Sequence, residues 1–437
     1  MHKRKHLNTM NIKDLYNLFL KHPQITIDSR KCPKNSIFFA LKGDNFDGNT
    51  FAEKALENGA SFAIIDNPLY KKDSRFILVD NTLKSLRELA AHHRQQLNIP
   101  IIGITGTNGK TTTKELTATV LSKKYNTLYT QGNLNNHIGV PLTLLKLTKE
   151  HEIAIIEMGA NHPGEIKDSV NLVCPTHGII TNVGKAHIEG FGSFENIVKT
   201  KAELYDFLRE NHGEIFINKD NPHLNKIALK LAQQTYAIND TSANITGKII
   251  ECNPFVSVKW TLNRISYETK THLIGNYNLE NILAAICIGN YFGVCPENIS
   301  KAISEYIPQN NRSQLTKTEK NQLIVDTYNA NPTSMEAALI NFNEIKNVSQ
   351  KAVLLGDMLE LGYESKQEHL RIVELIDKLQ LKAFLVGKEF SAINQNHQTF
   401  LSVDDFITWV KDNKLTGYTL LIKGSHGIHL EKAIQYL

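Results

Sequence analysis

A short glycine-containing loop carries the residue types that bind phosphate. GTNGKTT at 106–112 follows the apolar run IPIIGIT and precedes a stretch with helical periodicity. Backbone N–H groups of such a loop attract anions, Lys110 adds a cation, and a hydroxyl of Thr111 or Thr112 suits Mg²⁺. The longer pattern G-x-x-x-x-G-K-[ST] fails because residue 104 is isoleucine, and a plain turn is the alternative. The predicted phosphate-binding residues are Gly106, Thr107, Asn108, Gly109, Lys110, Thr111 and Thr112.

Two more polar side chains lie where predicted strands end. Glu157 closes the run IAIIE, and His187 follows GIITNV in NVGKAHIEGFG. Doubly wound sheets bind ligands beyond the carboxyl ends of their strands, so we expect both residues to join Lys110 at one nucleotide–metal site. Taken singly, such a glutamate is more often a cap or a surface ion pair, and such a histidine is an ordinary loop residue.

Lys201 lies on an apolar stripe of a predicted helix. In FENIVKTKAELYDFLRE, it shares helical spacing with Ile197, Leu204 and Leu208. A lysine is usually a surface charge whose stem lies on apolar neighbours. One that faces inward must be paired, neutralised or chemically modified, which makes Lys201 a candidate site residue.

Further motifs are rich in amide side chains or lie at strand ends. Asparagine can hydrogen-bond sugars, bases and peptide groups, although single clusters of this kind are most often turns. KGSHG follows the apolar run YTLLI and offers a cation and a hydroxyl. These motifs are QGNLNNH (131–137), GNYNLEN (275–281), DTYNANP (326–332) and KGSHG (423–427).

The pattern of strands and helices predicts an α/β protein of three domains. Short strand-like runs with one helix indicate a small α/β unit before residue 98. From Ile99, strands alternate with helices, which is typical of a doubly wound, mostly parallel sheet. A second such series begins near Leu315 and predicts a Rossmann-like α/β domain, with 303–313 as the hinge. The predicted domains are 1–97, 98–312 and 313–437.

Net charge, apolar runs and cysteine content argue against a nucleic-acid-binding, membrane-spanning or disulfide-bonded protein. The chain has 437 residues and a net charge of +5, a small excess that does not indicate a nucleic-acid binder. No apolar run is long enough to predict a membrane span. Five cysteines without a C-x-x-C pair favour free thiols in a reducing cytoplasm over disulfides or zinc. The basic start lacks the apolar stretch of a secretory signal, so residues 1–9 are interpreted as a loose extension or a mis-assigned start.

Eight motifs occur in one order along the chain, and the match to which they belong runs from about Asp28 to the C-terminus. Together they resemble the motifs of the cytoplasmic Mur ligases of peptidoglycan synthesis. A set of eight motifs in one order is far more specific to a family than any single motif. The eight are GTNGKTTTKE, GNLNNHIGVPLTLL, IIEMGANHPGEI, AHIEGFGS, NYNLENILAA, DTYNANPTSM, LGDMLELG and IKGSHG.

The resemblance implies an amide bond made with ATP through an acyl phosphate, with release of ADP and phosphate. DTYNANPTSM and GDMLELG favour the member that joins D-alanyl-D-alanine to a UDP-N-acetylmuramoyl-tripeptide and so forms the pentapeptide. The diamino-acid-adding member carries a DNPR signature that is absent here. The substrates are then these two molecules, without nucleic acid or a membrane span, and a monomeric, cytoplasmic enzyme is expected.

The resemblance also carries roles onto single residues. Lys110, Glu157, His187 and Lys201 are implied to be catalytic, and Lys201 matches a lysine that relatives carry as a carbamate. Mg²⁺, expected as two ions, is implied at Thr111, Glu157, His187 and Lys201. Further ATP contacts are implied at Asn278, Asn281, Arg312 and Asp326. Substrate contacts are implied at Asp28, Ser29, Arg30, Asp47, Asn135, Asn136, Asn329, Asn331, Lys423 and Ser425, with Asn329 and Asn331 assigned to D-alanyl-D-alanine.

Two departures and three alternatives accompany this hypothesis. Asn311 stands where the family more often has glycine, and His426 where relatives often carry arginine. A sister ligase, such as the diamino-acid-adding member or a folylpolyglutamate synthase-like enzyme, would act with another amine. A nucleotide switch or motor would need a partner-binding feature that the sequence does not show. An inactive binding protein is disfavoured because Lys110, Glu157, His187 and Lys201 are intact.

Overall fold

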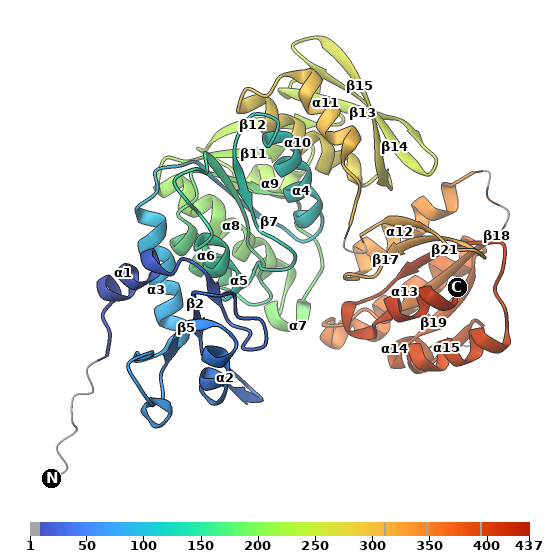
Figure 1. The fold of residues 1–437 in the computed structure, drawn as a ribbon. Helices are drawn as coiled ribbons and strands as arrows, with labels where there is room; N and C mark the ends of the chain where they lie inside the picture. The colour runs from blue at the N-terminus through green and yellow to red at the C-terminus, as the bar shows by residue number, and fades with distance from the viewer. Residues whose placement is uncertain (1–8, 310–311, 347, 349, 394–395) are drawn as a thin grey trace. The chain divides into compact units, whose positions relative to one another are not determined.

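The computed structural model describes residues 9–309, 312–346, 348, 350–393 and 396–437 (Figure 1). Residues 1–8, in which the sequence predicted a loose extension, and Asn311 lie outside the described residues. The chain forms two compact units. The first comprises the residues up to Gly103, Tyr125–Gly159 and Lys167–Thr176, and the second comprises Ile104–Lys124, Ala160–Ile166 and His177–Leu437.

The N-terminal part of the first unit is built on a small sheet of four parallel strands in the order β1-β2-β5-β6. The two inner strands are mostly buried and pack against α2 through a core that includes Phe38, Ala55 and Ala63. A short antiparallel hairpin, β3–β4, follows β2. The elements are α1 (Ile12–Lys21), β1 (Ile25–Thr26), β2 (Ser36–Phe39), β3 (Lys42–Gly43), β4 (Phe46–Asp47), α2 (Ala52–Glu57), β5 (Ala60–Ile65), β6 (Phe76–Leu78) and α3 (Thr82–Gln95).

The remainder of the first unit contains two parallel strands, β8 and β9, and the short helix α5. The buried guanidinium of Arg94, in the last turn of α3, ties the following segment down. It donates to the carbonyls of Leu97 (2.5 Å), Val173 (3.0 Å) and Cys174 (3.2 Å). The elements are β8 (Thr127–Tyr129), α5 (Gly139–Leu144), β9 (Ile153–Glu157) and, for the most part, α6 (Glu165–Val173).

The largest sheet has the strand order β15-β14-β13-β12-β11-β10-β7-β9-β8. Strands β10 to β13 are parallel, whereas β13, β14 and β15 form an antiparallel meander. Helix α10 is buried along most of its length and lies against α4 and β12. The elements are β7 (Ile101–Thr105), α4 (Lys110–Leu121), β10 (His177–Ile180), α7 (Ile188–Phe191), α8 (Phe194–Glu210), β11 (Glu214–Asn218), α9 (Pro222–Ile227), β12 (Ala232–Ala237), β13 (Ile245–Cys252), β14 (Phe255–Leu262), β15 (Ile265–Ile274), α10 (Asn278–Tyr291) and α11 (Pro296–Glu305).

The C-terminal region is a six-stranded sheet in the order β16-β17-β21-β18-β19-β20, with helices on both faces. All neighbours are parallel except β16 and β17. Capping boxes at Asn331 and Ser402 begin α12 and α15. The elements are β16 (Gln314–Lys317), β17 (Gln322–Asp326), α12 (Pro332–Glu344), β18 (Gln350–Gly356), α13 (Ser365–Lys378), β19 (Lys382–Val386), α14 (Lys388–Ile393), β20 (Gln398–Phe400), α15 (Val403–Asp412) and β21 (Tyr418–Lys423).

The structure confirms the predicted α/β class and parallel sheets, and α8 spans the residues that the periodicity indicated. The antiparallel meander β13–β15 was not predicted. Its strands alternate buried and exposed residues, as expected where one face of a sheet is open to water. No helix among the described residues combines the length and the apolar character needed to cross a bilayer. The domain boundaries near 97 and 312 stay predictions.

Candidate functional site

The glycine loop lies in the second unit, between the end of β7 and the start of α4. Gly106 and Gly109 adopt φ values of +142° and +78°, which L side chains rarely reach. A Cβ at Gly106 would lie 2.0 Å from Thr181 Oγ1, and one at Gly109 would lie 2.4 Å from Asn281 Oδ1. Both positions therefore require glycine for the loop to fold against its neighbours.

Neighbouring groups fix the loop before any ligand arrives. The N–H of Thr107 donates to Asn182 O (3.0 Å), and that of Asn108 donates to Asn182 Oδ1 (2.9 Å). Thr181 Oγ1 donates to the Asn108 carbonyl at 2.6 Å. Thr181 and Asn182 follow β10, and sequence reasoning missed them, although their place just after a predicted strand was a usable signal. The result is a preorganised loop that can receive an anion.

Lys110 turns its ammonium back toward this loop. Its Nζ donates to the carbonyls of Gly106 (2.7 Å) and Thr107 (2.9 Å). Thr111, next in α4, is buried, and Thr113 Oγ1 donates to Asn281 Oδ1 at 3.1 Å. The loop thus presents a positive charge at a helix N-terminus, an arrangement that attracts phosphate oxygens.

Lys201 is buried, as its spacing predicted, with 3 % of its surface exposed. Burial, together with the nearby charge of Lys110, lowers the pKa of its ammonium to about 7 against the opposing charges of Glu165 and Glu203. Its Nζ lies 5.5 Å from the centre of the Phe191 ring. A lowered pKa favours the neutral form of the amine.

His187 precedes α7 in the left-handed region, with φ +52°. Its Nδ1 contacts Oε2 of Glu360, in the loop after β18. Hydrogen bonding to His187 holds the pKa of Glu360 below its ordinary value. Two residues earlier, the Lys185 ammonium lies 3.0 Å from Glu364 Oε2. Within the second unit, the segment after β10 thus meets the segment after β18.

Glu157 lies in the first unit, at the carboxyl end of β9. Its side chain is almost fully buried, and Oε1 accepts a hydrogen bond from Asn135 Nδ2 at 2.8 Å. Asn135 is therefore placed beside a strand-end carboxylate. Asn136 Oδ1 instead accepts the N–H groups of Ile138 (3.1 Å) and Gly139 (2.9 Å), which is the turn role that its cluster also allowed.

Asn278 and Asn281, predicted near adenine, lie in the first turn of α10. Asn278 Nδ2 donates to Ile274 O (2.8 Å), and Asn281 Nδ2 donates to Asn278 Oδ1 (2.9 Å). Both side chains are mostly buried, and Asn281 also accepts from Thr113 of α4. These amides join α10 to the helix that carries the phosphate loop. A contact with adenine stays a prediction.

The C-terminal motifs DTYNANP and KGSHG lie side by side at the ends of β17 and β21. Lys423 Nζ lies 2.6 Å from Asp326 Oδ2 and donates to Asn329 O (3.2 Å). Ser425 Oγ accepts the N–H of Leu359 (2.9 Å), from the loop after β18. Three strand ends thus bring their polar groups to one edge of the sheet, as expected for a doubly wound fold.

Two further residues of the C-terminal region, Asn331 and Arg312, contact the glycine loop and the Tyr328 ring. Asn331 caps α12 and donates through Nδ2 to Asn108 Oδ1 of the phosphate loop at 2.8 Å. The guanidinium of Arg312 stacks on the Tyr328 ring at 3.6 Å from its centre. Tyr328 was not singled out from the sequence. His426, one of the two noted departures, lies 6.4 Å from the same ring.

The predicted UDP-sugar residues lie in the first unit. Arg30 and Asp28 form an exposed ion pair at 2.9 Å, and its hydrogen bonds lower the pKa of Asp28 to about 2. The Ser29 carbonyl accepts from Asn58 Nδ2 at 2.7 Å. The exposed Asp28–Arg30 pair leaves both charges accessible to a ligand.

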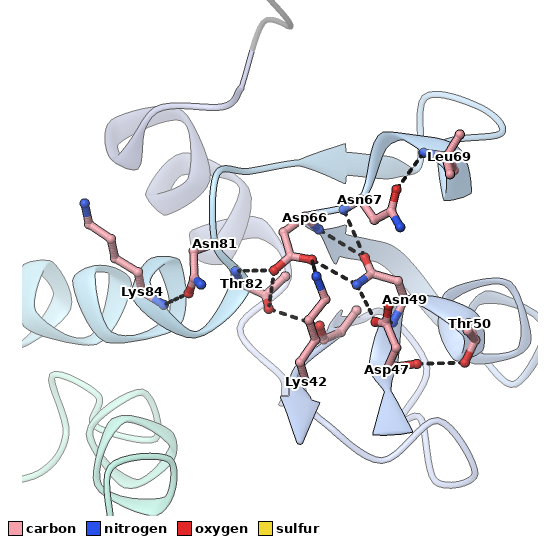
Figure 2. A network of polar contacts seen from close by, with 11 residues as sticks. Lys42, Asp47, Asn49, Thr50, Asp66, Asn67, Leu69, Asn81, Thr82 and Lys84 are labelled. Carbon is pink, nitrogen blue, oxygen red and sulfur yellow. Dashed lines mark hydrogen bonds and ion pairs between the residues drawn. The ribbon is translucent and has the colours of Figure 1, made fainter. Parts of the chain in front are cut away.

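Asp47 belongs to a polar network around the hairpin β3–β4 (Figure 2). Its carboxylate accepts from Asn49 Nδ2 at 2.6 Å, and the same amide donates to Asp66 Oδ1 at 2.9 Å. Asn49 Oδ1 accepts the N–H groups of Asp66 (3.1 Å) and Asn67 (3.3 Å). Asp66 also lies 2.9 Å from Lys42 Nζ. The network ties the hairpin to the end of β5.

Comparison with protein-family models gives three consecutive matches. Residues 23–94 match the Mur ligase family catalytic domain, 104–289 the Mur ligase middle domain, and 311–426 the glutamate ligase domain of Mur ligases. The UDP-N-acetylmuramoyl-tripeptide–D-alanyl-D-alanine ligase of Bacillus subtilis strain 168 is 35% identical over 453 residues. That alignment covers 98% of this chain and 97% of the relative.

Solved structures agree with these matches. A crystal structure of MurF from Acinetobacter baumannii superposes with a TM-score of 0.85 at 28% identity and covers 98% of each chain. The fold is also that of the MurF ligase of Thermotoga maritima in complex with ADP, with a TM-score of 0.83 at 24% identity over 95% of this chain and 97% of that one. The chain therefore belongs to the Mur ligase family, among its MurF members.

Proposed function

We infer that this chain joins D-alanyl-D-alanine to UDP-N-acetylmuramoyl-tripeptide, with conversion of ATP to ADP and phosphate. The observation that carries the inference is Lys201, a buried amine of lowered pKa close to the charge of Lys110 in a preorganised phosphate loop. The full-length similarity to enzymes with this name supplies the substrates.

The chain's own residues can perform the two steps of such a ligation. The carboxylate of the tripeptide attacks the γ-phosphate of ATP, and ADP leaves. Lys110 and those loop N–H groups that do not already donate to Asn182 would hold the β- and γ-phosphates and neutralise their charge. The amine of D-alanyl-D-alanine then attacks the acyl phosphate and displaces phosphate. Because little covalent work falls to the protein, positioning of the two substrates supplies most of the rate.

Mg²⁺ is the metal that the proposal includes. Among the described residues, no three His, Cys, Asp or Glu side chains form a cluster that could hold a metal alone. Mg²⁺ commonly binds one or two carboxylates together with substrate phosphates, so such a cluster is not required. Thr111, Glu157, His187 and Lys201 would hold the ions, directly or through water. The metal would supply charge neutralisation on the transferring phosphoryl group.

Lys201 would take part in metal binding as a carbamate. A neutral amine adds to carbon dioxide and loses a proton, which converts a would-be cation into an anionic oxygen ligand. The lowered pKa of the Lys201 ammonium makes the neutral amine available near pH 7.

The other polar residues would orient the three substrates. Adenine would lie near Asn278 and Asn281, with Arg312 and Asp326 on phosphate and ribose. The UDP-sugar would bind in the N-terminal domain, and the dipeptide near the motifs after β17 and β21. The proposed substrate residues are Asp28, Ser29, Arg30, Asp47, Asn135, Asn136, Asn329, Asn331, Lys423 and Ser425.

The proposal includes a cytoplasmic monomer with domains 1–97, 98–312 and 313–437. The five cysteines carry free thiols, which suits a reducing compartment. The family-model matches fall one in each proposed domain, except that the third begins at residue 311.

The test is phosphate release from ATP and Mg²⁺ with UDP-N-acetylmuramoyl-tripeptide, with and without D-alanyl-D-alanine. We expect release that requires both substrates, and a product mass equal to the pentapeptide. Lys201→Ala should abolish this release. Lys199→Ala, which removes an exposed lysine of the same helix, serves as the matched control and should retain it.

Three other outcomes would change or contradict the proposed function. Release that ignores D-alanyl-D-alanine but responds to a diamino acid or to glutamate would indicate a sister ligase. Release unchanged in Lys201→Ala would remove the proposed role of the buried lysine. A chain that binds ATP without any substrate-dependent release would contradict the ligase function itself.

A further inference from the structure

The guanidinium of Arg312 lies against an aromatic ring and not against a carboxylate. Its central carbon is 3.6 Å from the centre of the Tyr328 ring. Among the described residues no carboxylate pairs with it, and its buried Nε has no hydrogen-bond partner. Buried donors in folded proteins nearly always have a partner, and a functional role is one of the few explanations for an exception. The Lys423 ammonium differs, because it already pairs with Asp326 at 2.6 Å.

The pairing of two strands brings Arg312 and Tyr328 together. Strands β16 and β17 are antiparallel, with Gln314 opposite Val325, so the residues just before β16 lie beside those just after β17. Arg312 precedes β16 by two residues, and Tyr328 follows β17 by two residues. The register of the sheet therefore sets the contact between the two side chains.

The backbone next to Arg312 is held as well. Ser313 is buried and adopts the left-handed region, with φ +48°, which is uncommon for serine. Its Oγ lies 2.8 Å from Oη of Tyr277, the residue that precedes α10. Ser313 thus fixes the backbone of the arginine, and the Tyr328 ring fixes its guanidinium.

The segment that carries Tyr328 also contacts the glycine loop. Asn331, three residues after Tyr328, caps α12 and donates through Nδ2 to Asn108 Oδ1 at 2.8 Å. The stacked pair therefore belongs to the strand end that meets this loop, where the proposed function places the phosphates of ATP. That proposal gives Arg312 a contact with ATP and gives Tyr328 no role.

We propose that Tyr328 is a positioning residue, whose ring holds the Arg312 guanidinium in the orientation in which it binds a phosphate of ATP. A guanidinium is planar and can bind phosphate oxygens through two parallel N–H groups, so its orientation decides whether both bonds form. A long side chain that is ordered beforehand loses less conformational freedom when the ligand binds. The inference deepens the proposed function and rests on its assignment of ATP to Arg312.

The test is a double-mutant cycle on the affinity for ATP. Equilibrium dialysis with radiolabelled ATP and Mg²⁺, without the other substrates, gives the Kd. Tyr328→Leu should raise this Kd by roughly 3- to 12-fold, the cost of ordering one long side chain. In the Arg312→Gln background, which has no guanidinium to hold, the same change should alter the Kd by less than about twofold. Equal effects in the two backgrounds would mean that the ring does not act through Arg312, and the inference would be wrong.

Further variants separate the ring from a general effect on the fold. Tyr328→Phe keeps the ring and should bind ATP within about twofold of the wild type. Tyr418→Leu is the matched control, because it removes another half-buried tyrosine of the same sheet, whose ring lies 5.0 Å from Lys382 Nζ. Its Kd for ATP should not change. An equal loss in Tyr328→Phe and Tyr328→Leu, or an equal loss in Tyr418→Leu, would overturn the inference. If urea unfolding shows that Tyr328→Leu does not fold, Tyr328→Met takes its place in the cycle.

The other substrates also carry anionic groups, so their affinities are measured in Tyr328→Leu. The Kd for UDP-N-acetylmuramoyl-tripeptide and the KM for D-alanyl-D-alanine should not change appreciably. A loss for either substrate with an unchanged Kd for ATP would assign Arg312 to a carboxylate or to the UDP pyrophosphate, and the inference would be wrong. Because the Kd for ATP is measured without turnover, a wild-type chain that binds ATP but releases no phosphate would contradict the proposed function alone.

Discussion

Lys201 and Asp66 are both charged groups taken out of water, but their surroundings are opposite. Lys201 lies on the apolar face of α8, and burial lowers the pKa of its ammonium to about 7. Burial disfavours the charged form of Asp66 as well, which for an acid raises the pKa. Contacts with Lys42, Asn49 and Thr82 nevertheless bring the pKa of Asp66 below its ordinary value. The first group is pushed toward its neutral form and the second is held in its charged form.

The difference indicates which buried charges take part in chemistry. A carboxylate surrounded by donors, such as Asp66, is stable as an ion and fixes the shape of the β3–β4 hairpin (Figure 2). An amine that burial makes neutral is reactive, and it costs folding free energy unless it is modified or paired. Removal of Lys201 should therefore reduce activity, whereas disruption of the network of Asp66 should reduce stability.

Lys201→Met should have the largest effect on activity. We expect kcat to fall by roughly 100- to 1000-fold, the scale seen when a group that stabilises the reacting charge is removed. The free energy of unfolding should stay the same or increase, because an apolar side chain of similar length replaces a desolvated amine. Steady-state kinetics and urea unfolding measure the two quantities.

Lys199→Met is the control on the same helix. Its lysine is exposed, so neither kcat nor the free energy of unfolding should change appreciably. A large loss of stability in Lys201→Met would mean that the lysine stabilises the fold, and the contrast with Asp66 would fail.

Asn49→Ala should have the largest effect on stability. The change removes an amide that donates to Asp47 and Asp66 and accepts two backbone N–H groups. It leaves the nearly buried Asp66 carboxylate with one donor fewer, and we expect a cost of about 3 kcal/mol. Urea unfolding of the full chain measures the cost.

Asn67→Ala provides the comparison within the same network. Its side-chain oxygen accepts the N–H of Leu69 (3.1 Å) at a half-exposed turn, so about 1 kcal/mol or less is expected. Similar costs for the two asparagines would show that burial of the amide does not set the energy of the network.

Local patterns were sufficient to predict the parts of the site that depend on one segment. The glycine loop between β7 and α4 follows from glycine, lysine and threonine between a strand and a helix, and the burial of Lys201 follows from helical spacing; phosphate binding by the loop stays a prediction. The α/β class follows from the alternation of strands and helices. Each of these features depends on residues close in sequence, and a single chain is enough to show them.

Features that join distant segments could not be predicted in the same way. Asn49 and Asp66 are 17 residues apart, and their network depends on the end of β5 returning to the hairpin. Glu360 and His187 are 173 residues apart, and nothing in either motif indicates the contact. The meander β13–β15 was not predicted, because its alternating, half-exposed strands carry a weaker apolar signal than the continuous apolar strands of the parallel sheet.

His93 extends the comparison to a group that is buried in its neutral form. Its Nε2 lies 2.9 Å from Leu147 O and its Nδ1 lies 3.3 Å from Tyr16 Oη, and burial lowers its pKa. Below the ordinary histidine pKa, the unfolded chain therefore binds a proton that the folded chain does not bind. Stability should fall as the pH decreases through about 6.5.

The measurement is the urea midpoint at pH 7.5 and at pH 5.5. Wild-type protein should unfold at lower urea at pH 5.5, and His93→Gln should show a smaller difference between the two pH values. His177, whose pKa burial also lowers, remains in the variant and should account for part of the residual dependence. An equal difference in both proteins would assign the pH dependence to other groups.

Two lysine–carboxylate pairs of the N-terminal domain provide the most direct test of the role of burial. Lys42 pairs with Asp66 at 2.9 Å and Lys72 with Glu53 at 2.5 Å, but the Asp66 side chain is 5% exposed and that of Glu53 is 54% exposed. Lys72→Ala should cost less than about 0.5 kcal/mol, because water replaces the lost partner on both sides. Lys42→Ala should cost about 1 kcal/mol or more, because water reaches the Asp66 carboxylate poorly. The distances alone predict the reverse order, so equal or reversed costs would show that distance, and not burial, determines what these pairs contribute.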